Sequence, residues 1–336
     1  MLCIRNGLLV LPGGVREADL YIRGDRIFSV GGRWADAEVI DAAGCWVFPG
    51  FLCADPPAGH FAEQSEKALA WGYTTLAASG SPGRSSTDYC RGYTEVSFEK
   101  EICTLRERGG SGCTLRPGLT EEKIRALLAA AAPDILVRAG AEQTERILSA
   151  AVDLNTPLWL GPLRNRKELE SVRSARGCGA PILMEIGPEI LSRRGAGEER
   201  KALLEALHRG EFDLFSGGEW GKGTALLLRE LGEQGSRGLM TALHMLCEQP
   251  ARALGLWPRK GALKVGNEAD ITIWDPNSRG VISGEEQPLS GGSTLRESQS
   301  VQGRARDVLL RGRLVAGRGI VLRYGLGRDI GDQPDR

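Results

Sequence analysis

The tract Gly44-Cys-Trp-Val-Phe-Pro-Gly-Phe-Leu-Cys-Ala-Asp-Pro-Pro57 decides the fold of this chain. Its apolar residues run through 46–52 without alternating with polar ones, which is typical of a strand covered on both faces. The tract becomes polar at Asp55 and ends in Pro56-Pro57, which indicates a loop after the strand. It therefore predicts a buried strand that opens into a polar loop.

The same order of apolar strand, polar loop and helical pattern repeats along the middle of the chain. The predicted strands are 46–52, 74–79, 94–98, 112–116, 134–139, 157–161, 181–186 and 212–217. The predicted helices are 61–71, 99–108, 120–132, 142–152, 165–177, 197–209, 224–232 and 238–254. Eight such units in about 200 residues lie at the lower limit for a (β/α)8 TIM-type barrel, an α/β fold. Thr120 can cap the third helix, whose first turn is acidic.

Both ends of the chain contain short β-like runs separated by glycine-rich turns. We therefore expect 1–45 and 257–325 to form one small β-sandwich domain, with the barrel at 46–256 and a tail at 326–336. Residues 283–305 are polar and rich in glycine and serine, and they are predicted to form a loop.

Composition excludes several functions. The 336 residues include 43 basic and 43 acidic side chains, so no net charge attracts nucleic acid or an anionic membrane. The N-terminus does not have a signal-peptide pattern, and no apolar run is long enough to span a bilayer. The eight cysteines include no Cys-x-x-Cys pair, which favours buried free thiols in the cytoplasm.

Four tracts resemble the cyclic-amide branch of the amidohydrolase superfamily, which includes dihydroorotase, dihydropyrimidinase and allantoinase. They are 44–51 (G-x-x-V-x-P-G-F), 68–76 (A-L-A-x-G-x-T-T), 249–256 (N-P-A-R-x-x-G-L in the family) and 261–270 (G-x-I-x-x-G-x-x-A-D). The resemblance covers nearly the whole chain. It implies the barrel with a small β domain, and in active members two zinc ions that hydrolyse a cyclic amide.

The resemblance also implies a ligand set that this chain does not have. The family's site uses four histidines, an aspartate and a lysine that carries a carboxylate. The matching positions here are Asp55 and Pro57 (His-x-His pair), Thr114 (lysine), Arg138 and Pro162 (fifth- and sixth-strand histidines) and Gly218 (aspartate that acts as general base). With neither metals nor base to activate water, we expect no zinc cofactor and no catalytic residues.

The chain has only three histidines. His208 lies at the end of a helical pattern, where a cation favours the helix dipole. His244 lies at helical spacing and is interpreted as a packed helix residue. His60 alone follows the altered loop, and a metal-binding role for it is the alternative to a structural one.

Four polar residues remain near the carboxyl ends of the predicted strands, where the active site of a barrel lies. They are Asp55, Arg138, Glu185 and Glu219. One interpretation is a salt-bridge cluster in which Arg138 replaces the charge of the metals. A second is a ligand pocket that binds an anion through Arg138. A third is a single-metal site formed by Asp55, His60, Glu185 or Glu219.

The sequence thus predicts a dihydroorotase-like protein that has lost catalysis and acts as an assembly or regulatory subunit. Expected partners are a second copy of the chain or a pyrimidine-pathway enzyme, by analogy with inactive dihydroorotase-like partners of aspartate carbamoyltransferase. The alternative is an active hydrolase of a cyclic amide with a rebuilt site.

Overall fold

The computed structural model describes residues 1–56, 59–78, 85–107, 112–192, 197–216, 221–281 and 300–330. The chain forms two compact units: Met1–Arg91 with Gly217–Arg336, and Gly92–Ser216. In the part of the chain that the structure describes, no helix is long and apolar enough to cross a membrane.

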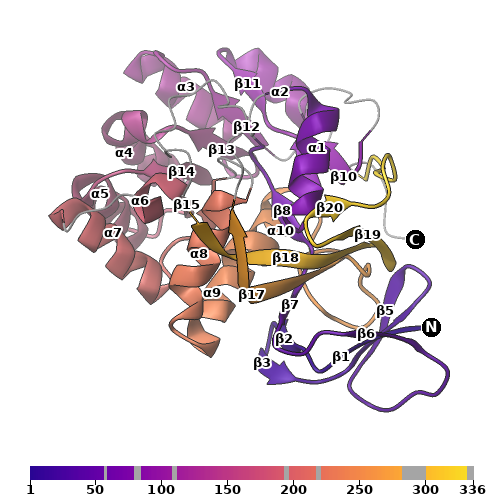
Figure 1. Ribbon diagram of the computed structural model, residues 1–336. Coiled ribbons are helices and arrows are strands. Elements are labelled where there is room, and N and C mark those ends of the chain that lie inside the picture. The colour runs from indigo at the N-terminus through magenta and orange to yellow at the C-terminus, as the bar shows by residue number, and fades with distance from the viewer. Residues whose placement is uncertain are drawn as a thin grey trace. The chain divides into compact units, whose positions relative to one another are not determined.

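The first unit contains two sheets built from the ends of the chain (Figure 1). One sheet has the order β5-β4-β1-β6 (Arg26–Val30, Leu20–Arg23, Leu2–Arg5, Glu38–Asp41). The other has the order β20-β19-β18-β17-β7-β2-β3 (Ile320–Val321, Arg313–Gly317, Ser300–Leu310, Ile271–Val281, Trp46–Pro49, Leu8–Leu11, Gly14–Glu17). Because β7 is parallel to β2 and antiparallel to β17, strands from both ends of the chain share one sheet, as predicted.

A single apolar cluster lies between these two sheets. The first sheet contributes Ile4, Leu20, Ile22 and Ile27, and the second contributes Leu9, Val47, Ile271 and Ile273. Each of these side chains is almost completely removed from solvent, which is worth about 1.5–3 kcal/mol per side chain. Burial of this one cluster therefore holds the N-terminal and C-terminal strands together.

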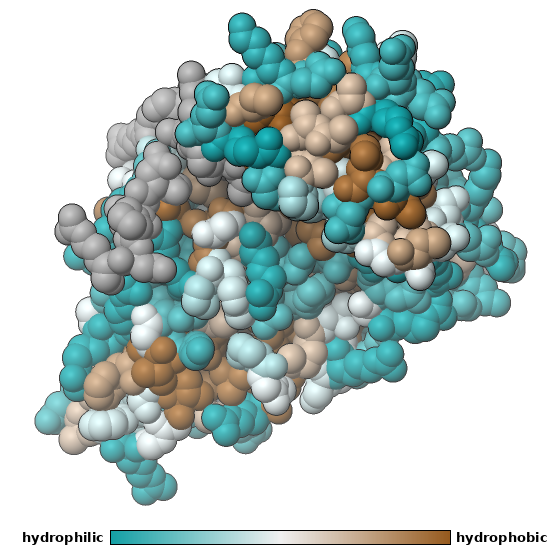
Figure 2. All heavy atoms as spheres, turned by 180° about the vertical axis from the view of Figure 1, so that it is seen from behind, coloured by the Kyte–Doolittle hydropathy of each residue, from teal (hydrophilic) through white to brown (hydrophobic). Residues whose placement is uncertain are grey.

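Apolar side chains of this unit also reach the surface. Figure 2 shows them gathered at the lower left, over the N-terminal strands. Among residues 1–45, the large apolar side chains that are exposed are those of Met1, Trp34 and Val39. The ring of Trp34 packs edge-on against Phe28 at a centroid distance of 4.8 Å, so part of this surface is ordered by aromatic contact.

The predicted strand 46–52 is two strands that belong to different sheets. β7 ends at Pro49, and β8 (Phe51–Cys53) pairs with β9 (Tyr73–Ala78). The amide of Gly50 donates to the carbonyl of Asp270 at 2.8 Å, whereas the next amide, that of Phe51, donates to Gly72 at 3.0 Å. A Cβ at Gly50 would overlap the side chain of Thr74, so a glycine is needed where the chain changes sheets.

The parallel sheet β8-β9-β10 completes the strands of the first unit. Helix α1 (Phe61–Ala70) connects β8 to β9, close to the predicted 61–71. Strand β10 (Asp88–Arg91) pairs with β9 and was not predicted, because its sequence Asp-Tyr-Cys-Arg contains no apolar run. The predicted helix at 224–232 is α8 (Lys222–Gly232).

The predicted helix 238–254 is interrupted. It consists of α9 (Ser236–Leu243), a π-helical turn (His244–Glu248) and α10 (Gln249–Ala253). Pro250 has no amide hydrogen and cannot take part in the regular helical ladder, and the wider π turn immediately precedes it. The proline therefore accounts for the end of the regular helix.

The second unit consists of one parallel sheet with helices packed along it (Figure 1). Its strands are, in spatial order, β11 (Thr94–Val96), β12 (Gly112–Leu115), β13 (Leu136–Ala139), β14 (Leu158–Leu163), β15 (Ile182–Ile186) and β16 (Leu214–Phe215). Its helices are α2 (Glu99–Glu107), α3 (Glu121–Ala131), η1 (Ala141–Gln143), α4 (Thr144–Leu154), α5 (Arg166–Gly177), α6 (Pro188–Ser192) and α7 (Glu198–Arg209). Thr120 caps α3 through the amide of Lys123, as predicted. The predicted helix 142–152 covers most of the 3-10 turn η1 as well as α4, and the short helix α6 was not predicted.

Two further predictions concern single segments. The predicted loop 283–305 is wrong at its end, because strand β18 begins at Ser300; residues 282–299 lie outside the described part of the chain. The prediction of free thiols is confirmed for all eight cysteines, and all but Cys103 and Cys178 are buried.

Candidate functional site

Three neighbouring strands bring together Arg138, Trp159 and Glu185. Apolar tracts make β13, β14 and β15 buried parallel strands, and their register sets Arg138 beside Trp159 and Trp159 beside Leu183. Glu185 follows Leu183 by two positions and therefore lies on the same face of the sheet. One face of this unit thus carries a cation, an indole and a carboxylate on adjacent strands.

The three side chains interact directly. Trp159 Nε1 donates a hydrogen bond to Glu185 Oε2 at 2.8 Å, and Arg138 Nη2 lies 3.6 Å from the same oxygen. The guanidinium carbon of Arg138 lies 4.8 Å from the centre of the Trp159 ring, a cation–π distance. The side chain of Glu185 is 0% exposed and that of Arg138 is 19% exposed. The hydrogen bond from Trp159 and the ion pair with Arg138 both compensate the carboxylate, as a buried charge requires.

This cluster suits charge compensation and not metal binding. Guanidinium and indole groups are hydrogen-bond donors without a lone pair for a metal. Tyr93 packs edge-on against Trp159 at a centroid distance of 5.6 Å, so the indole ring is also held by aromatic packing. Of the three acids predicted as partners of Arg138, Glu185 is one that pairs with it, and Glu219 lies outside the described residues.

The other predicted site residues are placed as follows. Thr114 of β12 lies opposite Arg138 in the register, and Pro162 lies near the end of β14. Asp55 follows β8 in the first unit and is half-buried. Pro57, Gly218 and Glu219 lie outside the described residues.

The three histidines lie at separate places, each in or directly before a helical element. His60 immediately precedes α1, His208 is in the last turn of α7, and His244 begins the π turn. The helical positions predicted for His208 and His244 are confirmed. Among the described residues, no group of three or more possible metal ligands contains a histidine.

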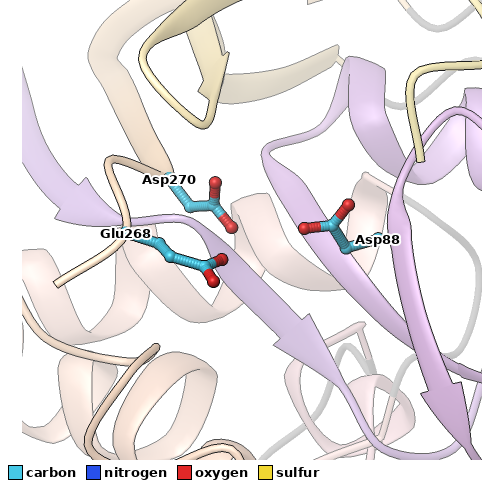
Figure 3. A group of neighbouring side chains, drawn as sticks. All are labelled: Asp88, Glu268 and Asp270. Atoms are coloured by element: carbon cyan, nitrogen blue, oxygen red, sulfur yellow. The ribbon is translucent and has the colours of Figure 1, made fainter. Parts of the chain in front are cut away.

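A second polar cluster, in the first unit, was missed by the sequence analysis. Figure 3 shows Asp88 facing Asp270 and Glu268 across a common space. In the described part of the chain, these three acids are the only group close enough together to hold a metal ion. Lys260 already occupies the space: its Nζ lies 3.0 Å from Asp88 Oδ2 and 2.8 Å from Glu268 Oε2, and it also contacts Asp270.

The charges of this cluster are paired by further arginines. Arg311 contacts Asp88 through its guanidinium and donates its backbone amide to Asp270 at 2.7 Å. Arg259 lies 3.6 Å from Glu268. Three cations thus face three carboxylates, so the arrangement is a buried ionic cluster with the ammonium group of Lys260 among the three carboxylates.

The pKa shifts follow from burial and from the unequal sharing of cations. Burial alone would raise the pKa of Asp88, but Lys260 and Arg311 outweigh it, and the pKa of Asp88 is lowered. Burial raises the pKa of Asp270, and Lys260 offsets only part of that effect. Burial would lower the pKa of Lys260, but the three carboxylates around it raise that pKa above its usual value. The ammonium group is therefore fully charged at neutral pH.

Sequence signals for this cluster were weak. Lys260 and Asp270 are separated by nine residues in a tract that the sequence analysis used only for family resemblance. Asp88 is 172 positions before Lys260, on the strand that was not predicted. A lysine and an aspartate that flank a tract of apolar and turn residues were the only local indication of a buried pair.

Comparison with known proteins defines the class. Residues 161–315 match the amidohydrolase family. The D-hydantoinase of Ralstonia pickettii is 23% identical over 94% of this chain and 95% of its own length, and the dihydroorotase of Syntrophotalea carbinolica is 26% identical over 93% and 98%. A solved D-hydantoinase structure superposes with a TM-score of 0.84 at 21% identity, covering 98% of both chains.

The fold is therefore that of hydantoinases, a TIM barrel with a β-sandwich domain formed by the termini, as predicted. Over nearly its whole length the chain is similar in sequence to cyclic amidohydrolases of the hydantoinase and dihydroorotase type, and residues 161–315 match the amidohydrolase family. The alignment with the Ralstonia protein spans 437 positions, more than the 336 residues of this chain, so this chain lacks residues at some of the aligned positions.

Proposed function

We propose that this protein is a non-catalytic homologue of the cyclic amidohydrolases, a pseudoenzyme that acts as an assembly or regulatory subunit. The observation that carries the proposal is the Arg138–Glu185 pair. Arg138 occupies the position of a metal-binding histidine in the family resemblance, and its charge lies 3.6 Å from a fully buried carboxylate. A cation built into this position disfavours a second cation there by direct repulsion.

The donor set does not fit the family's two zinc ions. Thr114 and Arg138 are neighbours in the register, at the positions matched to the bridging lysine and the fifth-strand histidine. Zinc sites use cysteine, histidine and carboxylate ligands, and neither threonine nor arginine supplies one of these. None of the three histidines lies within a strand: His60 immediately precedes α1, His208 is in α7, and His244 begins the π turn.

The biological role that we propose is association with another protein. A protein that keeps the fold of an enzyme without its catalysis can still act by binding another protein. By analogy, the partner is a second copy of the chain or a pyrimidine-pathway enzyme. A cytoplasmic location accords with the eight free thiols.

The first prediction concerns metal content. We expect the purified protein to hold no stoichiometric zinc, because the positions at Pro57, Thr114, Arg138 and Pro162 offer no ligand. Elemental analysis by mass spectrometry after dialysis against chelator-treated buffer measures this, with the R. pickettii D-hydantoinase prepared in parallel. About one or more zinc per chain that survives dialysis would contradict the proposal and favour a rebuilt site.

The second prediction concerns turnover. We expect no hydrolysis of dihydroorotate, dihydrouracil, hydantoin or allantoin above the rate of the buffer, with or without added zinc. The assay follows loss of the cyclic amide by chromatography, and the D-hydantoinase serves as the positive control. Activity that co-purifies with the protein and is abolished in Asp55→Asn or Glu219→Gln would show that the chain is an active hydrolase.

A further inference from the structure

The hairpin of β19 and β20 carries an exposed strip of arginine and apolar side chains. Gly317 pairs with Ile320, and Arg318 and Gly319 form the turn, with Arg318 at φ 52°. Ile320, Leu322 and Tyr324 are 65%, 53% and 51% exposed. We define the hairpin surface as Arg313, Arg318, Ile320, Leu322, Arg323 and Tyr324.

The arginines of the hairpin surface form no ion pair with a carboxylate in the part of the chain that the structure describes. Residues 313–328 contain four arginines and no aspartate or glutamate. Among the described residues, no carboxylate lies within 4.0 Å of Arg313, Arg318 or Arg323. The neighbouring helix α1 carries Glu63, Glu66 and Lys67. Their net charge of minus one is too small to neutralise the three arginines of the hairpin surface.

The same segment forms the edge of a sheet. β20 is the last strand in the order β20-β19-β18-β17-β7-β2-β3, so its outer backbone groups have no neighbouring strand among the described elements. Charged residues on an edge commonly prevent unwanted pairing, but a protected edge does not also expose isoleucine, leucine and tyrosine side by side. Arginine and tyrosine are enriched at protein interfaces and lysine is depleted, and 313–328 contains no lysine.

We propose that the hairpin surface binds an extended acidic segment of a partner protein, which adds to the edge at β20. Carboxylates of the segment pair with Arg313, Arg318 and Arg323, and its apolar side chains contact Ile320 and Leu322. This inference rests on the proposed function, since a subunit without catalysis acts through a partner, and it names the chemistry of that partner.

The test uses the full chain and a fluorescein-labelled peptide in which glutamate and valine alternate. Fluorescence anisotropy is expected to show saturable binding that weakens as salt is added. The triple variant Arg313→Gln/Arg318→Gln/Arg323→Gln is expected to bind about tenfold more weakly, as three lost ion pairs at an exposed site imply. Leu322→Thr, which keeps all the charge, is also expected to weaken binding.

The control is a second triple variant, Arg16→Gln/Arg33→Gln/Arg237→Gln, which removes the same charge from other exposed positions of the same unit. Equal loss in both triple variants, or equal binding of a lysine–valine peptide, would overturn the proposal, because either would indicate non-specific attraction. Binding to vesicles of phosphatidylserine and phosphatidylcholine that is lost only in the first triple variant, without peptide binding, would overturn it in favour of a lipid surface. Metal content and turnover are independent of these results, so failure here leaves the proposed function standing.

Discussion

Lys260→Met is expected to lower the free energy of unfolding by about 3–5 kcal/mol at neutral pH. Lys260 is 2% exposed and contacts Asp88, Glu268 and Asp270, of which Asp88 is fully buried. Methionine fills most of the volume of the lysine but leaves three carboxylates facing one another with only Arg311 and Arg259 to compensate them. Denaturation in urea, followed by circular dichroism, measures the change.

The pH dependence distinguishes lost charge from lost packing. In the parent, the pKa of Lys260 is raised in the folded state. The stability that its charge contributes is therefore complete below the unfolded-state lysine pKa of about 10.4, and it is lost only in strong base. In the variant, loss of the ammonium group is expected to raise the folded pKa of Asp88 and of Asp270, because burial favours the neutral carboxyl group. Proton uptake by the folded state then restores stability as the pH falls, so the deficit is expected to shrink from pH 7 toward about pH 5.

Lys264→Met is the matched control, because Lys264 is exposed and lies four residues further along the same segment. It is expected to change stability by less than about 0.5 kcal/mol. A Lys260→Met protein as stable as the parent, or one whose deficit does not depend on pH, would show that the ammonium group does not hold this cluster together.

Local pattern predicts much of this fold because each strand and helix carries its own periodicity. The strands at 134–139, 157–161 and 181–186 were predicted within two residues, since apolar runs between polar loops identify them without knowledge of their neighbours. Pairing partners have no such local signal. The change of sheet at Gly50 depends on Thr74 and Asp270, and nothing in the tract 46–52 itself indicates that its two halves face different strands.

The candidate site shows the same limit. The sequence predicted that Arg138 is paired and named three acids, because an arginine that follows Ile135-Leu-Val cannot remain isolated at low cost. Placing Glu185 beside Arg138 required the spatial order β13-β14-β15, which the structure supplies. The hydrogen bond of Trp159 to Glu185 was not predicted. Trp159 lies in the apolar tract 157–161, where a tryptophan is accounted for by packing alone. The Lys260 cluster was missed because it joins residues from distant parts of the chain.

Arg138→Met is expected to lower the free energy of unfolding by about 2–4 kcal/mol, between the values for exposed and buried ion pairs. The estimate lies below that for Lys260 because Arg138 is 19% exposed and its 3.6 Å distance to Glu185 exceeds that of a hydrogen bond. The loss also includes the contact of the guanidinium with the Trp159 ring. Urea denaturation at pH 7 measures it, with Arg146→Met on the exposed side of α4 as the control.

A double-mutant cycle isolates the pair from its packing. Glu185→Gln keeps an oxygen that can accept the hydrogen bond of Trp159 but removes the charge that Arg138 compensates. If the ion pair carries the effect, the double variant Arg138→Met/Glu185→Gln is expected to lose less stability than the sum of the single variants, by about 1 kcal/mol or more. The deficit of Arg138→Met alone is also expected to shrink in acid, where the remaining carboxyl group takes up a proton.

Additive losses with no pH dependence would mean that Arg138 contributes only its packing on Trp159. The guanidinium charge would then be available to an anion, and the ligand-pocket hypothesis would become the better account of why an arginine stands in this strand. Under that hypothesis, phosphate or a dicarboxylate would stabilise the parent but not Arg138→Met, since a ligand stabilises only the folded form that binds it. If Arg138 instead pairs with Glu185, that carboxylate already neutralises the guanidinium charge. Added anions are then expected to leave the difference in unfolding free energy between the parent and Arg138→Met unchanged.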